Sequence, residues 1–103
     1  MEIRITPKAH DDILGIYSYV KKDGEEIAKK QISDIYDDME NLADFPNIGT
    51  QLQKHVERRT DLRYLVIRKV YIAVYEVTDS INILRVFRKD QDFISALNMG
   101  NDS

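Results

Sequence analysis

Apolar residues recur at helical spacing over the first half of the chain. The first set follows Thr6-Pro7, a pair that favours a helix start because threonine caps free N–H groups and proline suits the first turn. The second set steps by four and three residues, which places it on one helical face. The two sets are Ala9, Ile13, Ile16, Tyr17 and Val20, and Ala28, Ile32, Ile35, Met39 and Leu42. The pattern predicts two amphipathic helices, the second beginning near Glu25 and about 18 residues long.

The connection between the two predicted helices is short. Lys21 and Lys22 suit the last turn of a helix, where cations meet the negative end of the helix dipole, and Gly24 suits a C-cap. The segment Phe45-Pro46-Asn47-Ile48-Gly49 ends the second helix. We therefore expect the two helices to form an antiparallel hairpin.

The second half of the chain is rich in β-branched and aromatic residues. Residues 62–67, 70–77 and 81–88 predict three strands joined by hairpin-length gaps, and residues 2–5 predict a short first strand. Arg68-Lys69 lacks the glycine or asparagine that a tight primed turn prefers, so this loop is expected to exceed two residues. Residues 50–61 predict a loop with room for a short extended piece. Asp90 is expected to cap a final short helix that carries Phe93, Ile94 and Leu97.

This element order predicts an α+β fold of the type β-α-α-β-β-β-(α). Its small, mostly antiparallel sheet, of about four strands, is expected to pack against the helical hairpin. A length of 103 residues suits one domain with one modest core. We expect a single domain over residues 1–98 and a frayed tail over residues 99–103.

Charge is unevenly divided along the chain. The net charge is -3 overall, but residues 1–46 carry 6 Lys/Arg against 11 Asp/Glu, and residues 54–89 carry 9 Lys/Arg against 4 Asp/Glu. A basic half of this kind suggests a surface for an anionic partner. The alternative is that these charges only solvate two exposed faces.

Composition also limits the cellular setting. The chain has no cysteine, which excludes disulfides and thiolate metal sites and is typical of a reducing cytosol. The N-terminus lacks the apolar segment of a secretory signal, and no run approaches the length of a membrane span. We expect a cytoplasmic protein with no membrane partner.

Strand alternation divides the side chains of the three long strands into two sets. The more apolar set is expected to face the helices; it comprises Leu62, Tyr64, Val66, Val70, Ile72, Val74, Leu84, Val86 and Arg88. The other set contains Arg63, Tyr71, Tyr75 and Arg85, which predict a half-open surface of guanidinium and phenol groups. Such a surface suits phosphate, carboxylate or base contacts. Alternatively, the tyrosines serve as strand formers and the arginine stems cover apolar surface.

Other site chemistries find little support in the sequence. Asp34 and Asp38 are spaced to share a metal on one helix, but no His or Cys accompanies them, and a solvated helix face explains them better. The serines lack a His/Asp partner pattern, and the four glycines are too scattered for a phosphate loop. We expect no cofactor and no metal.

Several motifs taken together resemble the RelE/ParE superfamily of bacterial type II toxins. They are Ile5-Thr6-Pro7-Lys8-Ala9 with Asp12, Ile16 and Tyr17; Leu42 through Pro46 to Gly49; Arg63 ahead of Tyr71-Ile72-Ala73-Val74-Tyr75-Glu76-Val77; and Ile83-Leu84-Arg85-Val86-Phe87-Arg88 with Asp92. The resemblance covers nearly the whole chain. It implies a small α/β toxin that is neutralised by a cognate antitoxin and either cuts mRNA on the ribosome or poisons DNA gyrase.

Within this superfamily the chain is closer to the ParE-like branch. Ribosome-dependent members carry an arginine directly after the first tyrosine of the Tyr-x-x-x-Tyr strand, a position that Ile72 occupies here. They also carry a Tyr or His near the C-terminal end, which residues 89–94 lack. The resemblance therefore implies growth inhibition by binding and poisoning DNA gyrase, the plasmid-stabilising activity of such modules, and no enzymatic step of its own.

The resemblance also suggests which residues act. Contact with the target is expected from Arg63, Arg85, Arg88 and Lys89, with Tyr71 and Tyr75 shaping the surface. The antitoxin is expected to lay an amphipathic helix, and perhaps a strand, on exposed apolar surface and to meet the basic half with acidic residues, giving a hetero-oligomer.

Two alternatives remain at this point. The first is a metal-independent endoribonuclease, an mRNA interferase acting with the ribosome and mRNA, in which the same four cations stabilise the scissile phosphate and His55 could act on RNA. The second is an inactive interaction module of the same fold.

Overall fold

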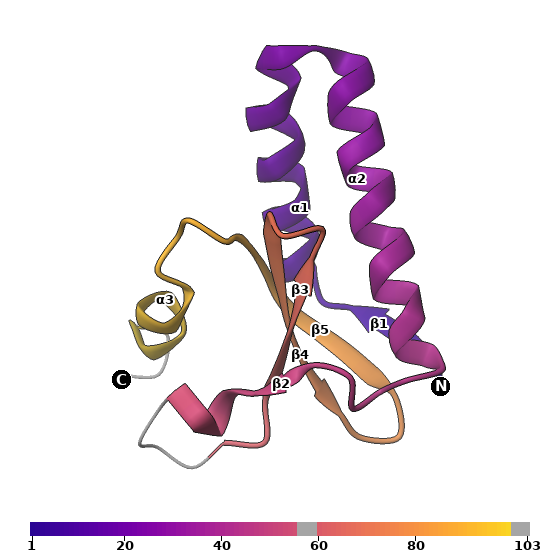
Figure 1. Ribbon diagram of the computed structural model, residues 1–103, viewed down its shortest axis with the longest axis vertical. Helices are drawn as coiled ribbons and strands as arrows, with labels where there is room; N and C mark the ends of the chain where they lie inside the picture. The colour runs from indigo at the N-terminus through magenta and orange to yellow at the C-terminus, as the bar shows by residue number, and fades with distance from the viewer. Residues whose placement is uncertain (56–59, 100–103) are drawn as a thin grey trace.

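The computed structural model describes residues 1–55 and 60–99 of the chain. A short first strand precedes two long helices, and the rest of the sheet and a short last helix follow (Figure 1). The elements are β1 (Ile3–Ile5), α1 (Pro7–Val20), α2 (Glu25–Glu40), β2 (Thr50–Gln51), β3 (Arg63–Ile67), β4 (Tyr71–Val77), β5 (Ile81–Arg88) and α3 (Phe93–Met99). Short 3-10 turns occupy residues 21–23, 41–43 and 52–55.

The strands form one five-stranded sheet in the order β1-β5-β4-β3-β2. Strand β1 is parallel to β5, and every other pair is antiparallel. The predicted α+β fold, with a mostly antiparallel sheet against a helical hairpin, is confirmed (Figure 1). The fifth strand is β2, the short extended piece for which the predicted loop left room.

The start of α1 and the turn between α1 and α2 follow from local sequence signals, as predicted. The Thr6 hydroxyl accepts a hydrogen bond from the Ala9 N–H at 3.2 Å, and Pro7 occupies the first turn of α1. Gly24 has a φ of 133°, a conformation that glycine adopts without steric cost, and it links the turn after α1 to the start of α2. The helices therefore run antiparallel, side by side, and extend beyond the sheet (Figure 1).

The helical hairpin covers the sheet face opposite to the one predicted. Leu65, Ile67, Tyr71, Ala73 and Tyr75 face α1 and α2, and they belong to the less apolar strand set. Much of the more apolar set is also covered, because α3 packs on the other face, although Val66 and Val70 are 43% and 48% exposed. Under α3 lies a second, smaller cluster built on Ile72, Val74 and Phe87, against which Leu62, Tyr64, Phe93, Ala96 and Leu97 pack.

A β-bulge explains why alternation fails along β5. Val74 pairs with Arg85, whereas the next residue, Tyr75, pairs with Ile83, which leaves Leu84 without a partner. The extra residue reverses the parity of the strand beyond it. Both Ile83 and Val86 therefore reach the core under the helical hairpin, although they belong to different sets in the sequence.

The turn between β3 and β4 has an unusual backbone. Arg68 and Lys69 have φ angles of 53° and 63°, and the Val70 N–H donates to the Ile67 carbonyl at 3.0 Å. These are the features of a primed turn made without glycine or asparagine, which costs about 1 kcal/mol or more per residue. Because Tyr71 pairs with Ile67, the loop has three residues, and the expectation of more than two is confirmed.

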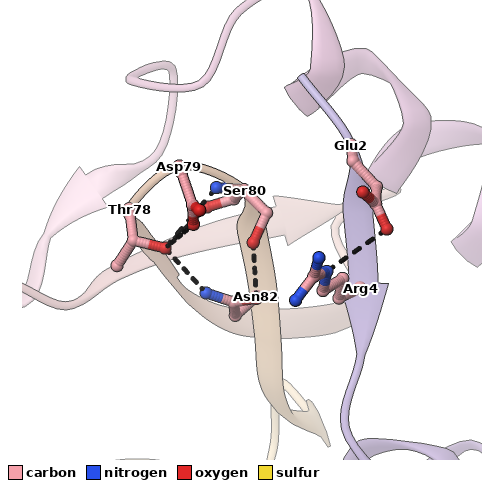
Figure 2. Close-up of polar contacts among 6 residues, drawn as sticks. All are labelled: Glu2, Arg4, Thr78, Asp79, Ser80 and Asn82. Atoms are coloured by element: carbon pink, nitrogen blue, oxygen red, sulfur yellow. Dashed lines mark hydrogen bonds and ion pairs between the residues drawn. The ribbon is translucent and has the colours of Figure 1, made fainter.

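Polar side chains hold the turn between β4 and β5 (Figure 2). The Asn82 amide donates to the Thr78 hydroxyl at 3.2 Å, and the buried Ser80 hydroxyl donates to the Asn82 carbonyl oxygen at 2.9 Å. On the adjacent β1, Arg4 forms an ion pair with Glu2 at 3.2 Å and lies level with Asn82 in the register. The three-residue gap that was predicted here is a closed, hydrogen-bonded hairpin.

The cap of the last helix lies two residues later than predicted. Asp92, not Asp90, caps α3: its carboxylate accepts from the Ser95 N–H at 3.1 Å and from the Ser95 hydroxyl at 2.7 Å. Helix α3 runs to Met99, and residues 100–103 of the predicted tail lie outside the described residues. Among the residues that the structure describes, no helix combines the length and the apolar character needed to cross a bilayer.

Candidate target-binding surface

A basic hollow lies where the β3–β4 turn meets the end of β5. Lys69, Val70, Arg88, Lys89 and Asp90 line it, and its volume is about 420 Å³. A hydrogen bond of 2.7 Å from the Lys89 N–H to the Val70 carbonyl joins its two sides. We call these five residues the basic hollow. Arg88 is the last residue of β5 and the other four lie in the turns next to β4 and β5, so strand pairing brings these residues together.

The cations of the basic hollow differ in how firmly they are held. The Arg88 guanidinium stacks on the Tyr19 ring at 4.2 Å and pairs with Asp90 at 3.5 Å. Lys69 and Lys89 are exposed, and neither forms an ion pair with another residue in the described ranges. The two lysines are therefore available to an anionic partner, and Arg88 presents its remaining donors in a fixed orientation.

Arg85 is engaged within the fold. Its Nε and Nη2 donate to the Asp12 carboxylate at 2.8 and 3.1 Å, and its guanidinium lies 4.6 Å from the centre of the Phe87 ring. Asp12 also accepts the Val86 N–H at 2.9 Å. This arrangement forms one wall of a groove of about 560 Å³ between α1, β5 and α3. Arg85 thus ties α1 to β5 and offers little to a partner.

Arg63 lies at the other end of the sheet. It is level with Tyr75 in the register, whereas Arg88 is level with Tyr71, a separation of about 13 Å along β4. Its Nη1 donates to the carbonyls of Gly49 and Asn47 at 2.9 and 3.3 Å. The four cations expected to act together therefore divide: Arg63 lies apart, Arg85 shares the groove with Arg88, and Arg88 shares the basic hollow with Lys89.

The prediction that Tyr71 and Tyr75 lie on an exposed surface is wrong. Their exposed fractions are 3% and 0%, because the helical hairpin covers their face of the sheet. The Tyr75 hydroxyl donates to the Pro46 carbonyl at 2.8 Å and accepts the Gly49 N–H at 2.9 Å. The Tyr71 hydroxyl is hydrogen-bonded to Gln31 on α2. The two hydroxyls therefore link the sheet to α2 and to residues 46–49 by hydrogen bonds.

Burial gives the two tyrosines a pH-dependent contribution to stability. It raises the pKa of Tyr71, against a smaller lowering by Arg88, and raises the pKa of Tyr75, against smaller lowerings by the Gly49 N–H and Arg63. The folded state therefore favours the neutral phenols. Their contribution to the free energy of unfolding is fully present below the unfolded-state pKa of about 10, and it is lost as pH rises through the folded-state pKa of each tyrosine.

We expect the melting temperature to fall above about pH 10, and to fall less steeply in Tyr71→Phe. Thermal melts of the wild type and of Tyr71→Phe across about pH 8 to 11 measure this difference. Parallel loss of stability with pH in the two proteins would contradict this expectation.

Sequence reasoning missed three contributors to this end of the molecule. Lys69 was interpreted only as loop, although the β3–β4 register places it beside Arg88 and Lys89. Tyr19 was given no role, although its ring stacks on the Arg88 guanidinium. Arg68 forms ion pairs with Asp38 at 3.2 Å and Asp34 at 3.6 Å. These pairs engage the two carboxylates considered as a metal site, and within the described part of the chain no group of three or more potential ligands is present.

Comparison with known proteins identifies the family. The sequence profile of the ParE toxin of type II toxin-antitoxin systems, parDE, matches residues 3–93. This chain belongs to the ParE toxin family. The match includes both helices of the hairpin and the sheet, so it covers the toxin fold and the basic hollow together.

A solved structure agrees with this assignment. The toxin is similar to a chain of the chromosomal ParDE TA system from P. aeruginosa, with a TM-score of 0.73 and 28% sequence identity over 85% of this chain and 95% of that chain. No curated protein matches the sequence significantly. As a ParE-family member, the toxin has a cognate antitoxin as its partner.

Proposed function

We propose that this toxin inhibits bacterial growth by binding DNA gyrase in the cytoplasm and stalling the enzyme's cleaved DNA complex. The observation that carries this proposal is the basic hollow, which Lys69, Arg88 and Lys89 line together. A fixed group of cations suits binding to an anionic surface, which is the kind of contact that a poison of a protein–DNA complex requires.

The surroundings of the basic hollow favour binding over RNA cleavage. Metal-free cleavage needs a base for the 2′-hydroxyl and an acid for the leaving oxygen. The nearest phenol along β4 is Tyr71, which is buried and has a raised pKa, so it is a poor base at neutral pH. The Tyr19 ring contacts Arg88 but is not among the residues that line the basic hollow. Ile72, at the position where ribosome-dependent relatives carry arginine, is 3% exposed and packs beneath α3. The side chain of His55 lies outside the described residues.

Two assays separate gyrase poisoning from the mRNA interferase alternative. Purified toxin is expected to inhibit supercoiling by gyrase and to increase the amount of cleaved DNA trapped with the enzyme. Primer extension on translated mRNA is expected to show no new cuts. Ribosome-dependent cuts with normal supercoiling would overturn the proposal. Normal supercoiling and uncut mRNA, together with unharmed cells, would favour an inactive module.

The lysines of the basic hollow offer the sharpest functional variant. Lys69→Glu with Lys89→Glu is expected to weaken gyrase inhibition at least about tenfold, since two attractive charges become repulsive. Both side chains are exposed, so the free energy of unfolding should change by less than about 0.5 kcal/mol. Lys8→Glu with Lys29→Glu on the helices makes the same change in net charge and serves as the matched control. Equal losses in the two double variants would contradict a specific role for the basic hollow.

The antitoxin is proposed to cover apolar surface of the helical hairpin with an amphipathic helix. Leu14 on α1 and Ile27 on α2 are 64% and 48% exposed and suit such contact. Its acidic residues would meet the basic half of the toxin. Because the antitoxin binds only the folded toxin, saturating antitoxin should raise the melting temperature.

A further inference from the structure

We propose that Arg68 is a positioning residue for the basic hollow. Through its ion pairs with Asp34 and Asp38 on α2, it holds the β3–β4 turn in a left-handed conformation and thereby keeps Lys69 within the basic hollow. The inference rests on the proposed function, in which the basic hollow binds the target. The conformation of the turn can nevertheless be measured in the toxin alone, without the target.

The middle of the β3–β4 turn has a conformation that its own residues disfavour. Arg68 and Lys69 have φ angles of 53° and 63°, a region in which the Cβ of an L-residue crowds the backbone. Hydrogen bonds from the Val70 N–H to the Ile67 carbonyl and from the Lys89 N–H to the Val70 carbonyl fix the two ends of the turn. At its middle, the Arg68 side chain contacts another element, α2. Residues with a side chain keep such a conformation where the surrounding structure holds them, and they cluster at functional sites.

Two carboxylates on successive turns of α2 hold the Arg68 guanidinium. Its Nε donates to both Asp38 oxygens, at 3.2 and 3.3 Å, and its Nη1 lies 3.6 Å from an Asp34 oxygen. Lys30 pairs with Asp34 at 3.4 Å and joins the same network. The Asp34 and Asp38 side chains are only 22% and 24% exposed, which limits the screening of these pairs by salt. The charge of Arg68 is therefore balanced within the toxin, and its contribution to the basic hollow is geometric.

The two residues at the middle of the turn have different surroundings. Arg68 contacts α2, whereas Lys69 lines the basic hollow together with Arg88 and Lys89, and Arg68 is not among the lining residues. Without the ion pairs, both turn residues would favour the right-handed region, whose turns impose a different twist on the two strands. That change would redirect the Lys69 side chain and leave the basic hollow with two of its three cations. Arg68 thus acts on the target through Lys69.

A double variant, Asp34→Asn with Asp38→Asn, releases Arg68 without changing the sequence of the turn. It is expected to inhibit supercoiling by gyrase at least about threefold more weakly than the wild type. This direction is opposite to the effect of net charge, because the loss of two negative charges would by itself strengthen binding to an anionic target. Asp37→Asn with Glu40→Gln makes the same change in charge at exposed positions of α2 and serves as the matched control, with inhibition equal to or stronger than that of the wild type. Thermal melting checks that both variants are folded.

A lysine substitution separates positioning from general stabilisation. In the wild-type background, Lys69→Ala should weaken inhibition at least about threefold, whereas in the Asp34→Asn, Asp38→Asn background it should weaken it further by less than about 1.5-fold. The difference arises because Lys69 has already left the basic hollow in that background. Equal losses in the two backgrounds would show that Arg68 does not position Lys69, and would overturn the inference.

Nuclear magnetic resonance measures the conformation of the turn in the toxin alone. A positive φ brings the amide proton of a residue close to its own α-proton. Arg68 and Lys69 are therefore expected to show strong intraresidue Overhauser effects in the wild type, and weaker ones in Asp34→Asn with Asp38→Asn. An unchanged Overhauser effect at Lys69 in this double variant would also overturn the inference. Failure of the wild-type toxin to inhibit gyrase would instead count against the proposed function, and the Overhauser measurement would still decide whether Arg68 holds the turn.

A rescue variant distinguishes positioning from direct contact with the target. Asparagine adopts the left-handed region readily and is common in primed turns. Adding Arg68→Asn to Asp34→Asn with Asp38→Asn should therefore restore both the Overhauser effect at Lys69 and the inhibition of gyrase. If Arg68 itself bound the target, this third substitution would restore the turn but not the inhibition, and that result would reject a purely positioning role.

Discussion

Replacing Gly49 with alanine is expected to destabilise the toxin by about 3 kcal/mol or more. A Cβ at this position would lie 2.5 Å from the Tyr75 hydroxyl oxygen and 2.7 Å from the Tyr64 carbonyl oxygen. The Tyr64 oxygen belongs to the backbone of β3, and Tyr75 is fully buried, so neither can move aside easily. Displacement would also break the hydrogen bond from the Gly49 N–H to Tyr75.

Thermal unfolding measures this effect against a matched control. At about 4–8 °C per kcal/mol for a domain of this size, the melting temperature of Gly49→Ala should fall by roughly 12 °C or more. Gly15→Ala makes the same substitution within α1, where nothing lies within 4 Å of the new Cβ, and should stabilise the helix by up to about 1 kcal/mol.

A double variant identifies the cause of the loss. Tyr75→Phe removes the oxygen nearest the new methyl group, so Gly49→Ala with Tyr75→Phe should lose less than the sum of the two single changes. If Gly49→Ala melts within about 2 °C of wild type, the close packing of residue 49 beneath β3 does not hold.

Replacing Asp12 with alanine is expected to cost about 2–4 kcal/mol. The Asp12 side chain is 12% exposed and accepts three hydrogen bonds, two from Arg85 and one from the Val86 N–H. Its removal leaves a guanidinium that is 24% exposed without its counter-ion, and an edge N–H without its acceptor. The partial exposure of Arg85 lets water recover some of the loss, which sets the expected cost below that of a fully buried pair.

Denaturant unfolding of two neighbouring variants separates this pair from general effects. Asp11→Ala removes an exposed carboxylate from the same turn of α1 and should change the free energy of unfolding by less than about 0.5 kcal/mol. Asp12→Ala with Arg85→Met removes both charges and should recover about 1 kcal/mol or more relative to Asp12→Ala alone. Equal stability of Asp11→Ala and Asp12→Ala would show that the pair contributes nothing to the fold.

The candidate site was only partly predictable because its residues meet through pairing between strands. Arg88 and Lys89 stood out as cations in a basic half of the chain, but Lys69 joins them only through the register of β4 with β3 and β5. Arg63 and Arg85 looked equivalent to them in sequence. They differ because carbonyl oxygens near Gly49 and the Asp12 carboxylate, both distant in the chain, engage them.

The sequence by itself determined the elements and their order, because these follow from local signals. Thr6-Pro7 starts α1, Gly24 separates the helices, and the three β-rich runs form strands, each within the span of a few neighbouring residues. Only the tertiary structure decided which sheet face the helical hairpin covers. Both faces of the sheet carry enough apolar side chains to be buried, and α3 packs on the second face. The bulge at Leu84 also reverses which face the following β5 side chains point to, and the sequence pattern does not show this reversal. The burial of Tyr71 and Tyr75, and with it the location of the exposed cations, follows from that choice of face.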